Sequence, residues 1–353
     1  MILLLGATGY IGQAFADELR RRGRLFIPLT RKALDYTNFD ILFDYVRKLK
    51  PEFLINAAGY TGRPNVDGCE SARSETVRGN ILFPQMVARV CFMNNIPWGH
   101  VSSGCIYSGA KIARNGSPRV ERNLGKARLR QMFIEHPECF VGFTESDQPN
   151  FSFRAPPCSF YSGTKALAEE VMRSVGQGYL WRLRIPFDEF DHPRNLLTKL
   201  QRHPRVYDNV NSLSHRGDFV RACLDLWERR APFGIYNVTN PGAVSTRQVV
   251  ALIEKILKPA RSFLYWKNDR QFYSSAAKAP RSNCILDVSK LLASGIRIRP
   301  VSEALRHALE KWQPIAANIE LMAAIPKPAS DWDFPLEKLD RTEPAPLRPD
   351  PFV

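Results

Sequence analysis

The stretch ILLLGATGYIGQAFADELR, residues 2–20, decides the fold. Its first four residues are apolar and predict a buried strand, and its second half predicts an amphipathic helix. Between them, Gly6, Gly9 and Gly12 follow the spacing G-x-x-G-x-x-G. Glycines in such a turn let the backbone approach a pyrophosphate closely, and the helix N-terminus offers free N–H donors to it. The stretch therefore predicts a doubly wound α/β domain, a Rossmann sheet, with a nicotinamide dinucleotide at this turn.

Several residues of this turn are expected to contact the cofactor: Gly6, Thr8, Gly9, Tyr10, Ile11 and Gly12. The alternative is an ordinary tight turn in a doubly wound protein of another kind. The next predicted strand, 24–30, ends at Arg31 and Lys32. A basic residue at this point accommodates a 2′-phosphate, whereas NAD-selective sites carry an acidic one. We therefore expect Arg31 to contact NADPH, with NADH as the alternative cofactor and a solvated pair as the alternative role.

The charge of the chain is strongly positive. Its 353 residues include 50 Lys and Arg against 35 Asp and Glu, a net charge of +15. This favours anionic ligands, among them nucleotide sugars, NADPH and nucleic acid. The basic residues are scattered rather than interleaved with aromatic residues in one block, so we expect no nucleic-acid binding.

Cysteine content and hydropathy indicate the compartment. The seven cysteines include no C-x-x-C pair, which favours a reducing compartment without disulfides or a structural zinc, so no metal is expected. No apolar run approaches the ~18 residues of a membrane span. A strand predicted at the first residues also leaves no room for a signal peptide. We expect a cytoplasmic protein with no membrane contact.

A third buried strand is predicted at 53–55, and the chain then runs through Asn56 into Ala57, Ala58 and Gly59. Small residues at a strand end leave room for a cofactor against the edge of the sheet. Ala57, Ala58 and Gly59 are therefore further expected cofactor contacts.

The segment 60–67 is polar, rich in turn residues and unusual for a connection. We expect Arg63 and Asn65 to face a substrate; the alternative is a rigid loop. A long helix is predicted at 75–94, and its Asn80 is another candidate for substrate contact.

Catalytic candidates come from two later segments. The predicted strand 98–103 ends in Ser103, and a hydroxyl at the carboxyl end of a parallel strand points into the ligand crevice. Tyr161 and Lys165 open a predicted helix with i, i+4 spacing, so they share one face. An ammonium beside a phenol lowers the phenol's pKa, which makes Tyr161 a candidate acid/base. Both side chains are also expected to contact the cofactor.

The rest of the chain indicates how the domains divide. Residues 108–141 are basic, lack sustained periodicity and are interpreted as an insertion. After a predicted strand at 179–185, the stretch 186–211 reads as irregular. We expect a dinucleotide-binding domain at 1–182 and 212–240, a substrate-binding domain at 183–211 and 241–313, and a proline-rich tail at 314–353.

Several stretches together resemble the extended short-chain dehydrogenases/reductases. They are GATGYIG, NAAGYTGRPNVDGCE, SSGCIY, GFTESDQPNF, FYSGTKA, HPRNLLTK, NVTNPGAVS and APRSN, within residues 2–312. Among these enzymes the chain is most similar to the bifunctional nucleotide-4-keto-6-deoxyglucose 3,5-epimerase/4-reductases of rhamnose synthesis, relatives of dTDP-4-dehydrorhamnose reductase and GDP-fucose synthase. The resemblance explains neither the insertion nor the tail.

The resemblance implies a Rossmann domain that carries NAD(P)H and a smaller C-terminal domain that closes over a nucleotide sugar. It implies Ser103, Tyr161 and Lys165 as catalytic residues, and Cys105 and Lys199 as the acid/base pair of epimerisation. The nucleotide is expected to be UDP, with dTDP next, and a homodimer through the long helices is a family expectation.

Two further residues, Asn195 and Arg281, are expected to contact pyrophosphate or sugar. The chemistry agrees with the family roles, since a C4 ketone acidifies the protons on C3 and C5. Epimerisation then needs groups that remove a proton and return it from the opposite face, while hydrogen bonds stabilise the enolate oxygen. A buried thiol and amine can be tuned for such work.

Three other functions are alternatives to the epimerase/reductase activity. A sugar 4,6-dehydratase carries Asp-Glu after its Ser or Thr, whereas this chain has Gly104-Cys105, so dehydration is not expected. A 4-ketoreductase without epimerase activity would leave Cys105 and Lys199 without a role. A non-catalytic NADP-binding regulatory protein of the same fold is the third, although such proteins often lose part of the Ser/Tyr/Lys set.

Overall fold

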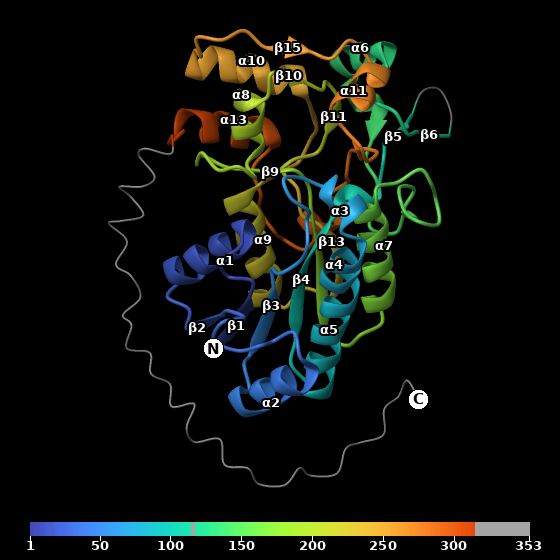
Figure 1. The fold of residues 1–353 in the computed structure, drawn as a ribbon. Helices are drawn as coiled ribbons and strands as arrows, with labels where there is room; N and C mark the ends of the chain where they lie inside the picture. The colour runs from blue at the N-terminus through green and yellow to red at the C-terminus, as the bar shows by residue number, and fades with distance from the viewer. Residues whose placement is uncertain (114–116, 315–353) are drawn as a thin grey trace.

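Six parallel strands form the central sheet of the protein, as a computed structural model that describes residues 1–113 and 117–314 shows (Figure 1). Their order is β13-β8-β4-β3-β1-β2. Their bounds are β1 Ile2–Leu5, β2 Phe26–Leu29, β3 Phe53–Asn56, β4 Trp98–Ser103, β8 Gly178–Leu183 and β13 Gly234–Asn237. Every neighbouring pair is parallel. The predicted doubly wound fold is confirmed.

Helices cover both faces of this sheet, which explains why its strands are continuously apolar. Ile2 and Leu4 pack on the face covered by α1 (Tyr10–Arg21) and α9 (Arg216–Glu228). Leu3 and Leu5 pack on the opposite face. That face is covered by α2 (Phe39–Leu49), α5 (Phe83–Met93) and α7 (Phe160–Met172).

The turn between β1 and α1 requires its glycines. Gly6 has φ +76°, and a Cβ there would lie 2.6 Å from the backbone nitrogen of Ala58. A Cβ on Gly12 would lie 2.0 Å from the carbonyl oxygen of Gly6. Glycine at these positions therefore brings the turn, the helix and the end of β3 into contact.

The predicted helix at 75–94 is not one regular helix. After a short α3 (Gly68–Ser71), the chain forms α4 (Arg73–Val77), a π-helical segment (Arg78–Leu82) and then α5. Asn80 lies within the π-helical segment, a kind of irregularity that is frequent at functional sites.

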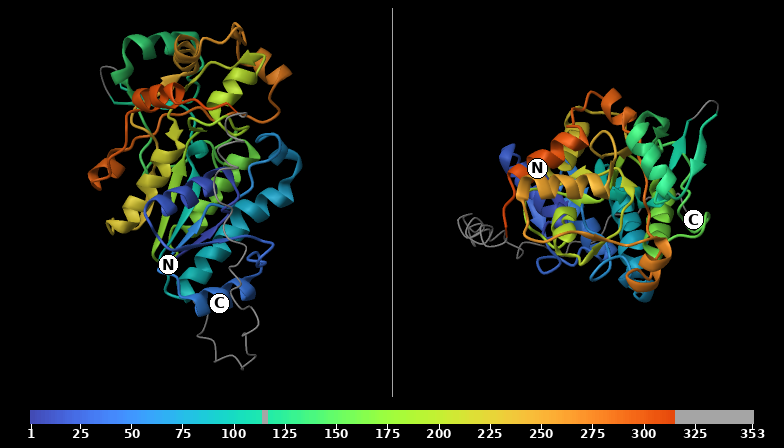
Figure 2. Two further views of the ribbon diagram at one scale, coloured as in Figure 1. Left: turned by 90° about the vertical axis from the view of Figure 1, so that its left-hand side faces the viewer. Right: turned by 90° about the horizontal axis from the view of Figure 1, so that it is seen from above.

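A smaller α-helical layer lies over the carboxyl ends of the strands, at the top of Figure 1 and in both views of Figure 2. Its core joins α8 (Leu196–Arg202), α10 (Thr246–Leu257) and α13 (Val301–Glu310). The remaining elements near it are β9 Pro186–Phe187, β10 Arg205–Val206, β11 Val210–Asn211, β12 Ser214–His215, β14 Val244–Ser245, β15 Leu264–Tyr265 and α11 Asp269–Ser275. Helix α12 (Ser289–Ala293) instead packs on the central sheet beside β13. The prediction that 186–211 is irregular is wrong at α8.

Residues 108–141 are folded as part of this upper layer. They form an antiparallel sheet with the order β6-β5-β7, and a helix, α6 (Ala127–Glu135). The strands are β5 Ala110–Ile112, β6 Arg119–Glu121 and β7 Phe140–Val141, and short 3₁₀ turns occupy Gly104–Ile106 and Pro137–Cys139. Leu129, Met132 and Phe133 of α6 pack with Val210 and Ile285. The sequence analysis found no sustained periodicity in this segment. The structure corrects that interpretation, because α6 is a helix with one buried apolar face.

The predicted tail, 314–353, lies outside the described residues apart from its first residue. Along the described part of the chain, no helix is both long and apolar enough to cross a membrane.

Candidate active site

The expected cofactor residues lie at the carboxyl ends of β1 and β3. Thr8 and Gly9 are exposed at the turn, and Gly9 caps α1 without any side-chain hydrogen bond. Gly12, in the first turn of α1, packs directly against Gly6. An uncapped helix N-terminus beside a glycine turn fits the pyrophosphate of a dinucleotide.

Two further expected contacts, Ala57 and Ala58, follow β3 directly, so they line the same edge. A Cβ on Gly59 would come within 3.6 Å of the Lys165 amine. The segment after β3 and helix α7 are therefore close neighbours. Arg31 is exposed beyond β2.

Ser103, Tyr161 and Lys165 are brought together. Ser103 ends β4, and its hydroxyl hydrogen-bonds Tyr161 and accepts from the Cys105 backbone N–H at 3.2 Å. The Lys165 ammonium donates to the carbonyl of Val101 at 3.4 Å. Burial lowers the pKa of Lys165 to about 8.

The protonation of Tyr161 differs from the expectation. Burial raises the pKa of the phenol, the nearby Cys105 raises it further, and the Ser103 hydrogen bond only partly offsets them. The prediction that Lys165 lowers this pKa is therefore wrong for this structure. A phenol that stays protonated at neutral pH is suited to donate a proton.

Cys105 lies two residues beyond Ser103 and is half-buried. A guanidinium N–H of Arg184 donates to its sulfur at 3.0 Å. Tyr161 and Lys165 both lie close enough to interact with it electrostatically. The thiol therefore belongs to the same cluster as the phenol and the amine.

Lys199 projects from α8 in the upper layer and is half-buried. Burial lowers its pKa, and the positive charges of Arg194 and Arg281 lower it further. Arg194 also donates to the Thr61 hydroxyl and lies near Tyr161. Sequence reasoning did not single out Arg194, although the stretch HPRN contains it.

Two asparagines expected to contact substrate bind other parts of the protein. Asn80 is fully buried; its amide accepts from Tyr60 N at 2.9 Å and donates to Tyr60 O at 2.8 Å. Asn195 is also fully buried and caps α8, accepting from Leu197 N at 2.9 Å and donating to Asp188. These hydrogen bonds use their polar groups within the protein, so each residue positions a loop, and substrate contact by either side chain stays a prediction.

The side chain of Tyr10 is directed at the upper layer. Its hydroxyl donates to Asp188 at 3.0 Å, and its ring stacks on His192 with centroids 4.4 Å apart. The Arg216 guanidinium lies 4.6 Å from the ring centroid. Tyr10 therefore links the two layers, while its backbone and that of Ile11 form the first turn of α1.

The loop 60–67 is held to the upper layer by Arg281. Both terminal nitrogens of this guanidinium donate to Asp67 at 2.7 Å. Asn65 is exposed and closes a local turn by accepting from Asp67 N at 2.8 Å, and Arg63 is exposed beside it. Arg281 is thus engaged in an ion pair, while Arg63 remains open to solvent.

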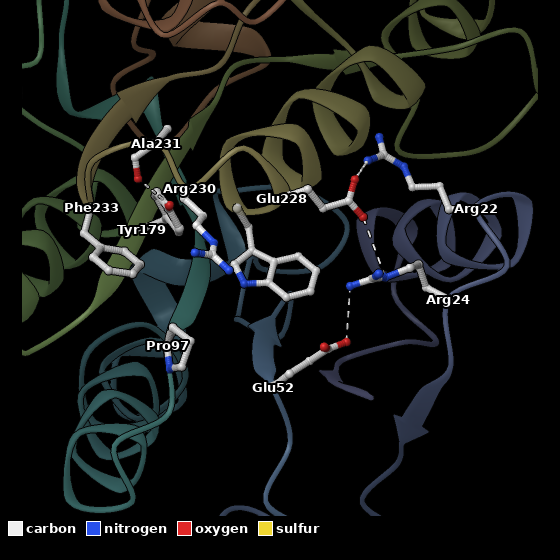
Figure 3. A pocket seen from close by; sticks show the side chains of 10 residues that line it. Arg22, Arg24, Glu52, Pro97, Tyr179, Glu228, Arg230, Ala231 and Phe233 are labelled. Carbon is white, nitrogen blue, oxygen red and sulfur yellow. Dashed lines mark hydrogen bonds and ion pairs between the residues drawn. The ribbon is translucent and has the colours of Figure 1, made fainter.

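A hollow of about 810 Å³ lies elsewhere, at the amino ends of the strands (Figure 3). Its lining includes Arg24, Glu52, Pro97, Tyr179 and Phe233. Ligands of open α/β sheets bind at the carboxyl ends, so this hollow is separate from the clustered catalytic candidates. Within residues 1–113 and 117–314, no group of three or more His, Cys, Asp or Glu side chains is arranged to hold a metal ion.

Comparison with known proteins identifies relatives. A family model described as the RmlD substrate binding domain matches residues 1–124. The chain is 31% identical over 305 residues to the bifunctional dTDP-4-dehydrorhamnose 3,5-epimerase/dTDP-4-dehydrorhamnose reductase of Arabidopsis thaliana, covering 86% of this chain and 90% of that protein.

A longer relative and a solved structure are also similar. A trifunctional UDP-glucose 4,6-dehydratase/UDP-4-keto-6-deoxy-D-glucose 3,5-epimerase/UDP-4-keto-L-rhamnose-reductase of Arabidopsis thaliana is 31% identical over 291 residues. The match covers 82% of this chain but only 39% of that protein. The UDP-rhamnose synthase of Acanthamoeba polyphaga mimivirus shares the fold, with a TM-score of 0.73 at 24% identity, over 88% of this chain and 98% of that one.

Proposed function

Because the chain belongs to the family of dTDP-4-dehydrorhamnose reductases and rhamnose synthases, which are NAD(P)H-dependent enzymes, we propose that it completes the synthesis of a nucleotide-activated 6-deoxyhexose. Its substrate is UDP- or dTDP-4-keto-6-deoxyglucose. The reactions are 3,5-epimerisation and reduction of the 4-keto group with NADPH, giving a rhamnose-type sugar.

One observation carries this proposal: Ser103, Tyr161, Lys165 and Cys105 form one cluster, with Lys165 beside Gly59 at the end of β3. A reductase needs the first three, and an epimerase needs an additional group that can exchange protons with carbon. All four residues meet where the end of β4 faces α7, which supports one sugar pocket for both reactions.

In the reduction, the bound cofactor supplies the hydride that adds to C4. Tyr161 donates its phenolic proton to the C4 oxygen, which a protonated, buried phenol can do. Ser103 hydrogen-bonds the same oxygen, and Lys165 positions the cofactor ribose next to the phenol. The turn of Gly6 and Gly12 admits the pyrophosphate, and the exposed Arg31 supports a preference for the 2′-phosphate of NADPH.

In the epimerisation, a base breaks the C–H bond at C3 or C5, and the electron pair passes into the enolate, whose charge rests on the C4 oxygen. A proton then returns from the opposite face, forming a new C–H bond. Cys105 and Lys199 are the acid/base pair. Since the pKa of Lys199 is lowered, its amine can exchange a proton nearer to neutrality than an exposed lysine.

The protein acts as a homodimer in the cytoplasm. Helices α5 and α7 lie side by side and expose apolar side chains on the outer surface, namely Leu82 before α5, Phe92, Met93, Leu167 and Val171. Such a surface on adjacent helices suits a second copy of the chain. Seven free cysteines favour a reducing compartment.

Product analysis tests the proposal. The protein is incubated with each 4-keto-6-deoxyglucose nucleotide and either NADPH or NADH, and the hexose is identified by NMR. We expect nucleotide-linked rhamnose, formed faster with NADPH. Reduction without inversion at C3 and C5 would identify a simple 4-ketoreductase, and no turnover of either nucleotide would favour a regulatory protein.

A further inference from the structure

Arg184 is a buried cation without a counter-ion. It follows β8 and is 1% exposed. Its guanidinium donates to Cys105 Sγ at 3.0 Å, to Asn211 Oδ1 at 2.5 Å and to the carbonyl of Ser282 at 2.6 Å. In the described part of the chain no carboxylate pairs with it, and its buried Nε has no hydrogen-bond partner.

The neighbouring arginine shows how the same fold treats a buried cation elsewhere. Arg182 is fully buried two residues earlier, and Glu169 accepts hydrogen bonds from its Nε at 3.0 Å and from its Nη2 at 2.8 Å. A buried charge costs free energy unless it is paired. Arg184 is buried without a carboxylate partner, so we expect its positive charge to serve a function that an ion pair would abolish.

The charged and titratable groups around Cys105 come from three directions. Tyr161 and Lys165 face it from α7, Arg184 from the end of β8, and Cys284 from the loop beyond α11. Among these groups, all in the described part of the chain, only Arg184 combines a permanent positive charge with a direct hydrogen bond to the sulfur. Gly104 leaves space for Leu286, since a Cβ there would lie 2.5 Å from Leu286 Cδ1, whereas Arg184 Cδ would be at an ordinary contact distance of 3.5 Å.

We infer that Arg184 is a positioning residue that holds the Cys105 sulfur and stabilises its thiolate, which makes Cys105 the base of the epimerisation. This inference rests on the proposed function for its substrate step. In that step the thiolate forms an S–H bond as the C–H bond at C3 or C5 breaks, and the C–H electron pair passes into the enolate. The guanidinium keeps its protons throughout and acts only through the sulfur.

Two variants change the charge at the sulfur in different ways. Arg184→Met removes the guanidinium. Asn211→Asp keeps the guanidinium but replaces the amide that accepts its hydrogen bond by a carboxylate, so Arg184 gains a counter-ion. Arg184→Lys retains the charge and is expected to rescue part of the effect. If Arg184→Met does not fold, as circular dichroism would reveal, Asn211→Asp carries the test.

The measured quantity is the rate of Cys105 alkylation by iodoacetamide as a function of pH, resolved by peptide mass spectrometry. We expect both variants to alkylate Cys105 at least about tenfold more slowly at neutral pH, because the thiolate is the reacting form. Cys139, which is also half-buried and makes no hydrogen bond to Arg184 or Asn211, is the internal control and should react at an unchanged rate.

Unchanged Cys105 alkylation in both folded variants would overturn the role of Arg184. This readout needs no sugar, so it separates the two proposals. If the variants slow alkylation but the wild-type protein incorporates no deuterium at C3 or C5 of the keto sugar, the epimerase function fails while the coupling of Arg184 to Cys105 stands.

Discussion

Tyr161 is held protonated by its surroundings rather than acidified by its lysine neighbour. It is buried, lies against Cys105 and hydrogen-bonds Ser103. The electrostatic balance therefore favours a proton donor, which is the role that reduction of a ketone requires. Lys165 contributes by its position beside Gly59 and by a pKa lowered to about 8.

Replacing Tyr161 by Phe tests this role. The variant loses one hydroxyl and keeps the ring, so substrate should bind while kcat for 4-keto reduction falls by about 10²–10⁴-fold. NADPH oxidation measures the rate. Tyr179→Phe is the matched control, because its hydroxyl bonds the Ala231 carbonyl at the amino end of the sheet. Wild-type turnover by Tyr161→Phe would remove the phenol from the mechanism.

At this scale, the sequence predicts some site residues better than others. Ser103, Tyr161 and Lys165 were identifiable because strand-end position and i, i+4 spacing are local properties. The hydrogen bonds of Asn80 and Asn195 within the protein were not foreseen, because an asparagine in a polar segment looks the same whether it binds a ligand or the backbone. Arg184 was missed because neither burial nor the lack of a counter-ion is visible in a sequence.

The elements that carry the site are predicted to different degrees. Strands β1 and β4 occur with the predicted bounds, residues 2–5 and 98–103. Helix α8 was missed because it has only seven residues and depends on the Asn195 cap and on tertiary packing. The π-helical segment Arg78–Leu82 was likewise not predicted, because nothing in the local sequence indicates it.

The glycine turn gives a prediction for two matched variants. In Gly12→Ala the added Cβ would lie 2.0 Å from Gly6 O, so α1 must move and both stability and NADPH affinity should fall. In Gly9→Ala the nearest atom would be 3.3 Å away, so the fold should persist while cofactor affinity falls. Thermal unfolding and NADPH titration measure the two effects. Full NADPH affinity in Gly12→Ala would contradict the assigned turn.

Acid stability depends on the contact of Glu189 with the N-cap of α9. Glu189 lies 3.1 Å from Nε2 of His215, whose Nδ1 accepts from Asp218 N. Burial raises the pKa of Glu189, but His215 outweighs it, so the pKa falls from 4.5 to about 2. A depressed carboxyl pKa stabilises the fold fully above 4.5, and this stability is lost as the pH falls toward 2.

Denaturant unfolding of wild type and Glu189→Gln at about pH 6 and about pH 3 measures this contribution. The wild-type protein should lose more of its free energy of unfolding on acidification than the variant, which cannot titrate at this position. Equal losses in the two proteins would exclude Glu189 as a source of the acid sensitivity.

For the whole molecule, the two layers are joined around the site. Asp67 and Arg281 link loop 60–67 to the upper layer, and Tyr10 and Asp188 link the glycine turn to it. The sequence predicts the two-part organisation from its change of pattern, but not these links, because their partners are 214 and 178 residues apart. The layers thus meet where the proposed cofactor and sugar sites adjoin.

Assembly is testable at the same scale. Light scattering should give a mass twice the chain's 40.2 kDa for the wild-type protein. A double variant, Leu82→Glu with Val171→Glu, should be monomeric because it places charges on the apolar surface of α5 and α7. Leu264 is equally exposed on β15, and Leu264→Glu should remain dimeric. A monomeric wild-type protein would refute the proposed dimer.

The central claim is that one pocket both exchanges protons at carbon and reduces the ketone. The most direct measurement is NMR of UDP-4-keto-6-deoxyglucose incubated with the protein in D₂O without NADPH. We predict that deuterium enters C3 and C5, that Cys105→Ala or Lys199→Met slows this severely, and that added NADPH then yields labelled rhamnose. Reduction of the ketone with no deuterium at either carbon would contradict it.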